Sequence, residues 1–447
     1  MNKKLIKNAT IVNEGKEFIG SILIDGERIE KIYEGEFPEE LNDECDCINA
    51  TGLLLLPGVI DDQVHFRDPG LTHKGDIFSE TRAAAAGGVT TFMDMPNTIP
   101  QTTTIEALNQ KFDLAAEKSL INYTFYFGAT NENLDEMQKE GIRRACGVKV
   151  FMGSSTGNML VDNADTLEAI FSSTDKLVAT HCEDEEVIAA NKKYFTSQFG
   201  DDLPIGFHSL IRSEEACFRS SFKAVNLALK HNTRLHVLHL STAKEMGLFA
   251  PGPLEKKRIT AEVCVHHLWF DDRDYESYGN MIKWNPAIKT RADKEALRDS
   301  LNNDVIDIVA TDHAPHLWSE KMGSCFNAAS GGPLIQHSLN VMLELHKKGI
   351  FTKAKIVEKM CHNPAILYRI KDRGFLREGY FADIVLVDPE SEWKVTGPNI
   401  LYKCGWSPFM NRKFSTQVIC TIVNGEIAFA NGIPNDEIRG KEIEFND

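Results

Sequence analysis

The pattern of hydrophobic and polar positions differs between the two ends of the chain and its middle. Residues 1–55 and 371–447 consist of short strand-like segments joined by turns such as Asp25-Gly26 and Asn424-Gly425. These two ends are expected to form one small β-sandwich domain. Residues 56–370 instead contain eight apolar segments that end in polar residues, with helix-like stretches between them.

Eight strands that alternate with helices predict an α/β fold built on a (β/α)8 barrel of the TIM type. In such a barrel the C-terminal ends of the strands converge on one mouth, where the chemistry occurs. The polar residues that close the segments are therefore expected to share a site. The segments span residues 58–67, 89–97, 123–130, 146–153, 176–184, 234–242, 258–267 and 305–316.

The first segment ends in DDQVHFR, residues 61–67. Alternate residues of a strand share a face, and polar side chains on the inner face are costly unless something binds them. The residues that point the same way here are Asp61, Gln63, His65 and Arg67. Taken alone, the segment is equally compatible with a strand that surfaces into solvent. Its place at the mouth of the barrel favours the rim of an active site.

Three histidines and one aspartate fall near the ends of four different predicted strands. They are His65, His181, His239 and Asp312. A single histidine of this kind is more often a hydrogen-bonded core residue than a ligand. The combination reverses that expectation, because imidazole and carboxylate are the usual ligands of zinc and similar metals. No metal role is expected for His73, His208, His231, His266, His267, His346 and His362, although His266 and His267 can help to line the barrel mouth.

Lys149 stands among apolar neighbours in GVKVFMG. A lone ammonium group is costly to desolvate in such a place. One interpretation is a lysine that pairs with a nearby carboxylate. The other is an uncharged amine that has reacted with CO2, because burial lowers the pKa of a lysine. The resulting carbamate has two oxygens and can bridge two metal ions.

Composition and charge narrow the range of functions. The 447 residues carry a formal charge of −16, which argues against nucleic acid and anionic membranes as partners. No apolar run reaches membrane-spanning length, and the first residues lack the apolar core of a signal peptide. The ten cysteines are scattered without a CxxC pair, which favours reduced thiols in a cytoplasmic protein.

Seven motifs, taken together, resemble the cyclic amidohydrolases, and among them most closely the dihydroorotase family. They occur in the family's order along residues 58–316, and the β-rich chain ends match the family's second domain. The motifs are GVIDDQVHFRDPG, MDMPNT, GVKVFMG, ATHCED, HVLHLST, WNPAIKT and ATDHAPH. The resemblance implies the reversible cyclisation of N-carbamoyl-L-aspartate to (S)-dihydroorotate in pyrimidine biosynthesis.

The resemblance also implies a cofactor and a set of site residues. The cofactor is zinc, with two ions favoured over one, and Lys149 carbamylated by CO2 bridges them. Asp312 is implied to be a metal ligand and the catalytic base and acid. The other implied metal ligands are His65, His181 and His239. The implied substrate-binding residues are Arg67, Asn97 and His316 for a free carboxylate, and Asn285 for the ring.

Gln63 departs from the family pattern, because the strand-one motif of the family is His-x-His and its first histidine would stand here. An amide oxygen is a weaker donor to zinc than imidazole. Gln63 either binds the metal through its oxygen or stands back and hydrogen-bonds while His65, Lys149 and Asp312 hold the ion. The second arrangement is favoured, with weakened metal affinity.

Two other functions stay open at this point. An allantoinase or hydantoinase would share the metals and the barrel but bind a substrate without the carboxylate, and Arg67 argues against it. A non-catalytic subunit of a pyrimidine-synthesis complex is the second, and Gln63 is the reason to consider it. The resemblance further implies a small-molecule substrate and a homodimer, and it allows association with aspartate transcarbamoylase. Residues 317–330 follow the last strand and are expected to form a mobile lid.

Overall fold

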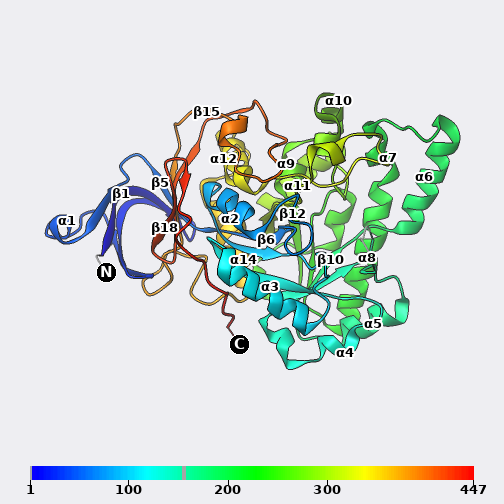
Figure 1. Ribbon diagram of the computed structural model, residues 1–447, viewed down its shortest axis with the longest axis horizontal. Helices are drawn as coiled ribbons and strands as arrows, with labels where there is room; N and C mark the ends of the chain where they lie inside the picture. Colours follow the sequence, from blue (N-terminus) through cyan, green and yellow to red (C-terminus); the bar gives the residue numbers. More distant parts are fainter. Residues whose placement is uncertain (1–2, 154–157, 447) are drawn as a thin grey trace.

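The computed structural model describes residues 3–153 and 158–446, and eight parallel strands form its centre (Figure 1). Each strand pairs in parallel with the next one along the chain. The backbone N–H of His65 donates to the carbonyl of His313 at 2.7 Å, which links the last strand to the first. The predicted barrel is therefore confirmed. Its strands are β6 (Val59–Val64), β7 (Val89–Asp94), β8 (Asn122–Gly128), β9 (Gly147–Phe151), β10 (Val178–His181), β11 (Leu235–Val237), β12 (Ile259–Cys264) and β13 (Ile308–Ala310).

Helices lie between the strands and cover the outside of the barrel (Figure 1). In α3 (Ile105–Lys118), the Thr104 side chain accepts a hydrogen bond from the Ala107 N–H, and Leu108 and Phe112 are buried. Among the described residues, no helix is long and apolar enough to cross a membrane. The other barrel helices are α2 (Ile77–Ala86), α4 (Leu134–Met137), α5 (Ala164–Ser173), α6 (Glu185–Phe199), α7 (His208–Ile211), α8 (Glu214–His231), α9 (Val265–Trp269), α10 (Tyr275–Tyr278), α11 (Arg291–Asn302), α12 (Ser338–Lys347), α13 (Lys353–Val357) and α14 (Asn363–Leu367).

Both chain ends join in one nine-stranded sheet beside the barrel, blue and red in Figure 1. Strand β5 connects the two ends, since it pairs in parallel with β1 and antiparallel with β14. Apolar residues from both ends, among them Ile11 and Ile422, share one buried cluster. The expected strand-rich unit of the two chain ends is thus confirmed. Its strands are β1 (Lys4–Asn13), β2 (Lys16–Asp25), β3 (Arg28–Glu34), β4 (Asp46–Asn49), β5 (Leu54–Pro57), β14 (Ile384–Asp388), β17 (Gln417–Val423), β18 (Glu426–Ala430) and β19 (Ile433–Pro434).

Two small elements, a strand pair and a short helix, accompany this sheet. Strands β15 (Trp393–Lys394) and β16 (Lys413–Phe414) pair with each other, and α1 (Leu41–Glu44) precedes β4. All ten cysteines of the chain are free thiols.

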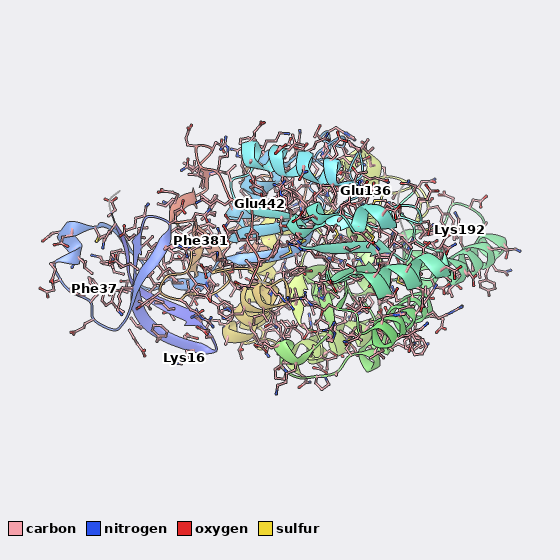
Figure 2. The ribbon with its side chains drawn as sticks, turned by 90° about the horizontal axis from the view of Figure 1, so that it is seen from below. Lys16, Phe37, Glu136, Lys192, Phe381 and Glu442 are labelled. Atoms are coloured by element: carbon pink, nitrogen blue, oxygen red, sulfur yellow. The ribbon has the colours of Figure 1, made fainter. Side chains whose placement is uncertain are left out.

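The segment after β19 leaves the sheet and returns to the barrel. The N–H of Tyr123, near the start of β8, donates to the Lys441 carbonyl at 3.0 Å. Arg144 donates to both carboxylate oxygens of Glu442 at 3.0 and 2.8 Å. Figure 2 places Glu442 beside the barrel, far from Phe37 at the strand-rich end of the molecule. The last residues of the chain therefore fasten the sheet unit to the barrel.

Candidate active site

A cavity of about 790 Å³ opens at the C-terminal ends of the barrel strands. All ten residues that the sequence places in the site line it. They are Gln63, His65, Arg67, Asn97, Lys149, His181, His239, Asn285, Asp312 and His316. The structure therefore brings the whole predicted set together in one cavity.

Three of these residues have a left-handed backbone conformation. The φ angles are 69° at Arg67, 39° at His239 and 48° at Asp312. Such a conformation costs a non-glycine residue about 1–3 kcal/mol and persists only where the surrounding structure holds it. The turns follow β6, β11 and β13, where they bring the three side chains to the cavity.

His181 and His239 lie against each other, with Nδ1 of His181 2.9 Å from Nε2 of His239. Nε2 of His181 donates to Oε2 of Glu183 at 2.9 Å, so Nδ1 carries the lone pair. Burial lowers the pKa of both imidazoles, so both rings are neutral near pH 7. Nδ1 of His239 is buried without a hydrogen-bond partner in the described part of the chain. Two buried, neutral imidazoles with ring nitrogens this close together are a ligand pair that suits a metal ion.

His65 follows β6 directly and contacts two other site residues. Its Nδ1 donates to Oδ1 of Asn97 at 2.7 Å. Its Nε2 is 3.2 Å from Oδ1 of Asp312. An imidazole nitrogen and a carboxylate oxygen are the ligand types that zinc binds, so this pair also fits a metal ion. Asn97, expected to bind substrate, thus also orients a predicted metal ligand.

Lys149 lies in the middle of β9 with 1% of its surface exposed. Burial lowers the pKa of its amine to about 8, although Asp312 and Glu262 act in the opposite direction. Its ammonium position is 4.7 Å from the centre of the Phe151 ring, and it forms no ion pair with a carboxylate of the described residues. The structure therefore offers the amine that the carbamate interpretation requires, without the partner that the ion-pair interpretation requires.

Gln63 turns both ends of its amide toward protein groups. Nε2 donates to Oδ1 of Asp312 at 3.3 Å, and Oε1 accepts from the thiol of Cys264 at 3.7 Å. The amide therefore hydrogen-bonds to groups that lie beside the predicted ligands.

Two cationic side chains lie in another part of the same cavity. Arg67 donates through Nε to the Pro315 carbonyl at 3.1 Å, and its Nη2 is 3.1 Å from Nε2 of His316. Nζ of Lys74 is 3.3 Å from Nδ1 of the same imidazole. Burial lowers the pKa of Arg67, which marks a guanidinium taken out of water. Oδ1 of Asn285 is buried without a partner among the described residues. This part of the cavity is suited to an anionic, hydrogen-bonding ligand.

The segment expected to be a lid forms part of the cavity wall. Residues 317–330 include a short 3-10 helix, Trp318–Lys321, and Ala329 and Ser330 line the cavity. Lys321 is buried, and its ammonium donates to the carbonyls of Ala329 at 2.8 Å and Gly331 at 2.7 Å. These two bonds hold the backbone of residues 329–331 in its place in the cavity wall.

Sequence reasoning missed a second cluster of metal-type ligands, formed by Asp62, His236 and Glu262. All three are fully buried, and their ligand atoms lie within 4.8 Å of one another. Although burial alone would lower it, the two carboxylates, 3.3 and 3.6 Å from its Nε2, raise the pKa of His236 to about 9. The N–H of His239 donates to Oε1 of Glu262 at 2.9 Å. The cluster therefore holds the backbone of His239, a predicted metal ligand, in position.

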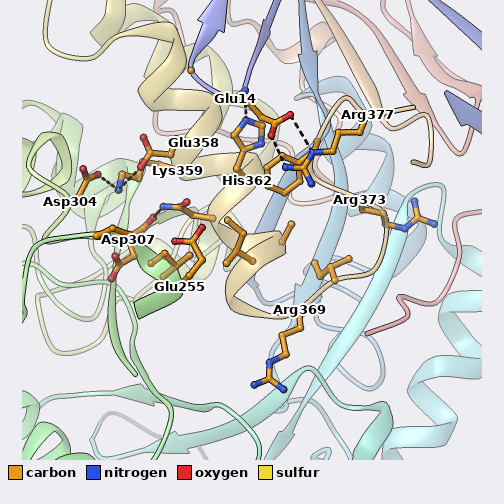
Figure 3. Close-up of a pocket in the computed structure, with 18 of the residues that line it drawn as sticks. Glu14, Glu255, Asp304, Asp307, Glu358, Lys359, His362, Arg369, Arg373 and Arg377 are labelled. Atoms are coloured by element: carbon orange, nitrogen blue, oxygen red, sulfur yellow. Dashed lines mark hydrogen bonds and ion pairs between the residues drawn. The ribbon is translucent and has the colours of Figure 1, made fainter. Parts of the chain in front are cut away.

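A larger cavity, of about 1020 Å³, is lined by none of the predicted site residues. Its charges are largely paired. Figure 3 shows Arg377 against Glu14 and Lys359 against Asp304, with contacts of 2.6 and 2.7 Å. The smaller cavity, which holds the metal-type ligands, is therefore the candidate active site.

The seven histidines without an expected metal role do not line the active-site cavity. His266 stacks on Trp284 with ring centres 4.3 Å apart. His267 contacts the Pro286 carbonyl through Nε2 at 3.2 Å. Both pack behind the mouth of the barrel. The expectation that they help to line the mouth is therefore not met.

The chain matches the amidohydrolase family over residues 54–428. The dihydroorotase of Methanosphaera stadtmanae is 31% identical over 429 residues, which cover 96% of each chain. The dihydroorotase of Methanosarcina mazei is 34% identical over 417 residues, which cover 90% of this chain and 89% of the relative. Among solved structures, the L-hydantoinase (dihydropyrimidinase) from Arthrobacter aurescens is similar with a TM-score of 0.90 at 25% identity, covering 97% of this chain and 98% of its own.

Proposed function

Because the chain belongs to the amidohydrolase family, we propose that it is a dihydroorotase, which interconverts N-carbamoyl-L-aspartate and (S)-dihydroorotate. The observation that carries this proposal is the buried contact of Arg67 with His316 in the same cavity as the metal-type ligands. The carboxylate of dihydroorotate suits this contact, since a guanidinium binds a carboxylate through two parallel hydrogen bonds.

Zinc is the cofactor that we propose, with two ions favoured over one. Ions held by such ligands lower the pKa of water and polarise an amide carbonyl, which is the chemistry that ring opening needs. As a carbamate, Lys149 would supply two oxygens to the ions. The residues proposed to hold them are His65, His181, His239, carbamylated Lys149 and Asp312.

Asp312 is the proposed proton carrier. Its carboxylate takes the proton of the attacking water and passes it to the ring nitrogen that leaves, and it acts in reverse when the ring closes. Contacts from His65 at 3.2 Å and Gln63 at 3.3 Å engage Oδ1. Oδ2 is therefore the oxygen that we assign to the proton.

Two alternatives are weaker. A hydantoinase-type function is favoured by the structural similarity to the L-hydantoinase. A substrate without a carboxylate would leave the buried Arg67 guanidinium without an anionic partner, which is costly. A non-catalytic role rests on Gln63, yet every other predicted metal ligand lies in the cavity.

The experiment that tests the function measures metal content and turnover on one purified sample. We expect bound zinc and hydrolysis of dihydroorotate, with little activity on allantoin, hydantoin or dihydrouracil. Preference for a substrate without a carboxylate would establish the hydantoinase alternative. Absence of metal and of all turnover would establish the non-catalytic one.

Replacing Arg67 by glutamine is expected to raise KM for dihydroorotate about 100-fold, because the substrate carboxylate loses its charged partner in a buried site. The contact exists in the ground state and in the transition state, so KM should suffer more than kcat. Steady-state kinetics check this, with Arg273→Gln as a control that removes an exposed guanidinium outside the cavity. Wild-type kinetics in Arg67→Gln would contradict the dihydroorotase assignment.

Gln63→His is expected to tighten metal binding without abolishing turnover, since imidazole is a stronger zinc ligand than an amide. The measurement is a chelator titration of both proteins, with activity followed at each concentration. If the variant loses activity at the same chelator concentration as the wild type, Gln63 does not limit metal affinity.

We further propose a cytoplasmic location, a homodimer that can associate with aspartate transcarbamoylase, and domains at residues 56–370 and at 1–55 with 371–447. Ten free thiols support the first of these.

A further inference from the structure

The cluster of Asp62, His236 and Glu262 joins three strands inside the barrel. Asp62 comes from β6, His236 from β11 and Glu262 from β12, and all three side chains are fully buried. Nε2 of His236 is 3.3 Å from Oδ2 of Asp62 and 3.6 Å from Oε2 of Glu262. None of the three lines the active-site cavity, so the cluster is separate from the ions proposed there.

Both carboxylates of the cluster are held through one oxygen, and each has a second oxygen without a partner. The Tyr368 hydroxyl donates to Oδ2 of Asp62 at 2.9 Å, and the N–H of His239 donates to Oε1 of Glu262 at 2.9 Å. Among the described residues, three atoms of the cluster have no hydrogen-bond partner: Oδ1 of Asp62, Nε2 of His236 and Oε2 of Glu262. Buried polar atoms without a partner are costly and rare, so three in one cluster point to a bound ligand.

The position of the His236 ring favours a metal ion over a direct hydrogen bond. In a hydrogen bond the acceptor lies close to the direction of the N–H, and Nε2 forms no such bond with either carboxylate. Two ligand atoms of one tetrahedral ion, each about 2.1 Å from the metal, are about 3.4 Å apart and lie off each other's axis. The distances of 3.3 and 3.6 Å from Nε2 agree with this spacing.

The charge of the cluster also favours a divalent cation. Because the two carboxylates raise the pKa of His236 against the effect of burial, the ring is an imidazolium near pH 7 when no ion is bound. One positive charge then faces two carboxylates in the core of the barrel, where an unbalanced charge is costly. A divalent cation displaces the proton of Nε2 to solvent and balances both carboxylates.

We propose that Asp62, His236 and Glu262 bind one zinc ion as a structural site inside the barrel. Carboxylate oxygen and imidazole nitrogen are zinc ligands, and the second oxygen of Asp62 can complete a fourfold coordination. The ion would join β6 to β11 and β12 and fix Glu262, whose other oxygen accepts the N–H of His239. It is additional to the ions proposed for the active site and does not depend on the reaction.

Metal analysis of Asp62→Leu is the first test. Leucine removes the ligand and leaves His236 and Glu262 as a neutral pair, so the barrel is expected to fold. Wild-type protein expressed with added zinc and purified without chelator should contain one more equivalent of zinc per chain than this variant. Asp61→Asn is the matched control, since the oxygens of Asp61 accept from the Thr311 hydroxyl at 2.6 Å and the Thr311 N–H at 3.2 Å. Equal zinc in wild type and Asp62→Leu, or the same loss in the control, would overturn the proposal.

A chelator separates this ion from ions in the open cavity. After folded wild-type protein is incubated with EDTA, one equivalent of zinc should remain, because the cluster is fully buried, and it should leave only when guanidinium unfolds the chain. Asp62→Leu treated in the same way should retain none. Complete loss of zinc from the folded wild type would overturn the proposal.

Anomalous X-ray diffraction gives a measurement that does not depend on the folding of any variant. Crystals of the wild-type protein, with data collected at the zinc absorption edge, should show a peak between the three side chains. A peak in the active-site cavity alone would overturn the proposal. A peak in the cluster without one in the cavity would support it while contradicting the zinc site of the proposed function.

Discussion

Lys149→Ala is expected to lose bound metal and activity together. Burial lowers the pKa of Lys149 to about 8, so at pH 7 the neutral amine is roughly 300 times more abundant than for a lysine of pKa 10.5. Neutral amine is the form that reacts with CO2 and releases a proton. Alanine cannot form the carbamate, and a cavity without it offers the ions no anionic bridge.

Metal analysis, activity and intact mass on the same samples check this result. The wild type should carry the mass of one added CO2, and short carboxylic acids should restore part of the metal and the activity to Lys149→Ala. Lys283→Ala is a matched control, since burial also lowers the pKa of Lys283 to about 8 but it does not line the cavity. That control should keep its metal. An active wild type with an unmodified Lys149 would contradict the carbamate.

Asp312→Asn is expected to lower kcat by ~10² or more. Asparagine keeps the shape of the side chain and its contacts with His65 and Gln63, but it cannot carry the proton. Because the same oxygen lies beside a predicted metal ligand, metal content must be measured on each kinetic sample. A fall in kcat at full metal content would assign the loss to proton transfer.

Asp307→Asn is the control for this variant. Asp307 immediately precedes the same strand, pairs with Lys257 at 2.6 Å and lies outside the active-site cavity. Its replacement should leave kcat unchanged even where it lowers stability. Full activity of Asp312→Asn with full metal content would contradict the role proposed for Asp312.

The barrel could be predicted because its strands are buried on both faces. All seven residues of β8 are buried, so the strand shows no alternation of buried and exposed positions, and most of its side chains are aromatic. Most of the predicted site residues, such as His181, come where a strand ends, and parallel strands end at the same mouth. Position along each strand was therefore enough to collect most of the lining of one cavity, while Lys149, in the middle of β9, was found through its apolar neighbours.

The supporting contacts could not be predicted, because they depend on directions that a sequence does not contain. Glu183 follows His181 by two residues and has the pattern of an ordinary loop carboxylate, yet it sets the tautomer of that histidine. Asp62, His236 and Glu262 come from three strands and meet only inside the closed barrel. Asn97 was assigned to substrate by resemblance, and its contact with His65 became visible only in three dimensions.

The pairing of β5 with both β1 and β14 determines the order in which the parts of this sheet can form while the chain is synthesised on the ribosome. Residues 54–57 are made early, and their partner at 384–388 is made only after the whole barrel. During that interval the edge of β5 has unpaired backbone N–H and C=O groups, which can pair with another extended segment. A contact between segments so distant in the chain also closes slowly. Completion of the sheet is thus a late event, and the nascent chain is most exposed to mispairing just before it.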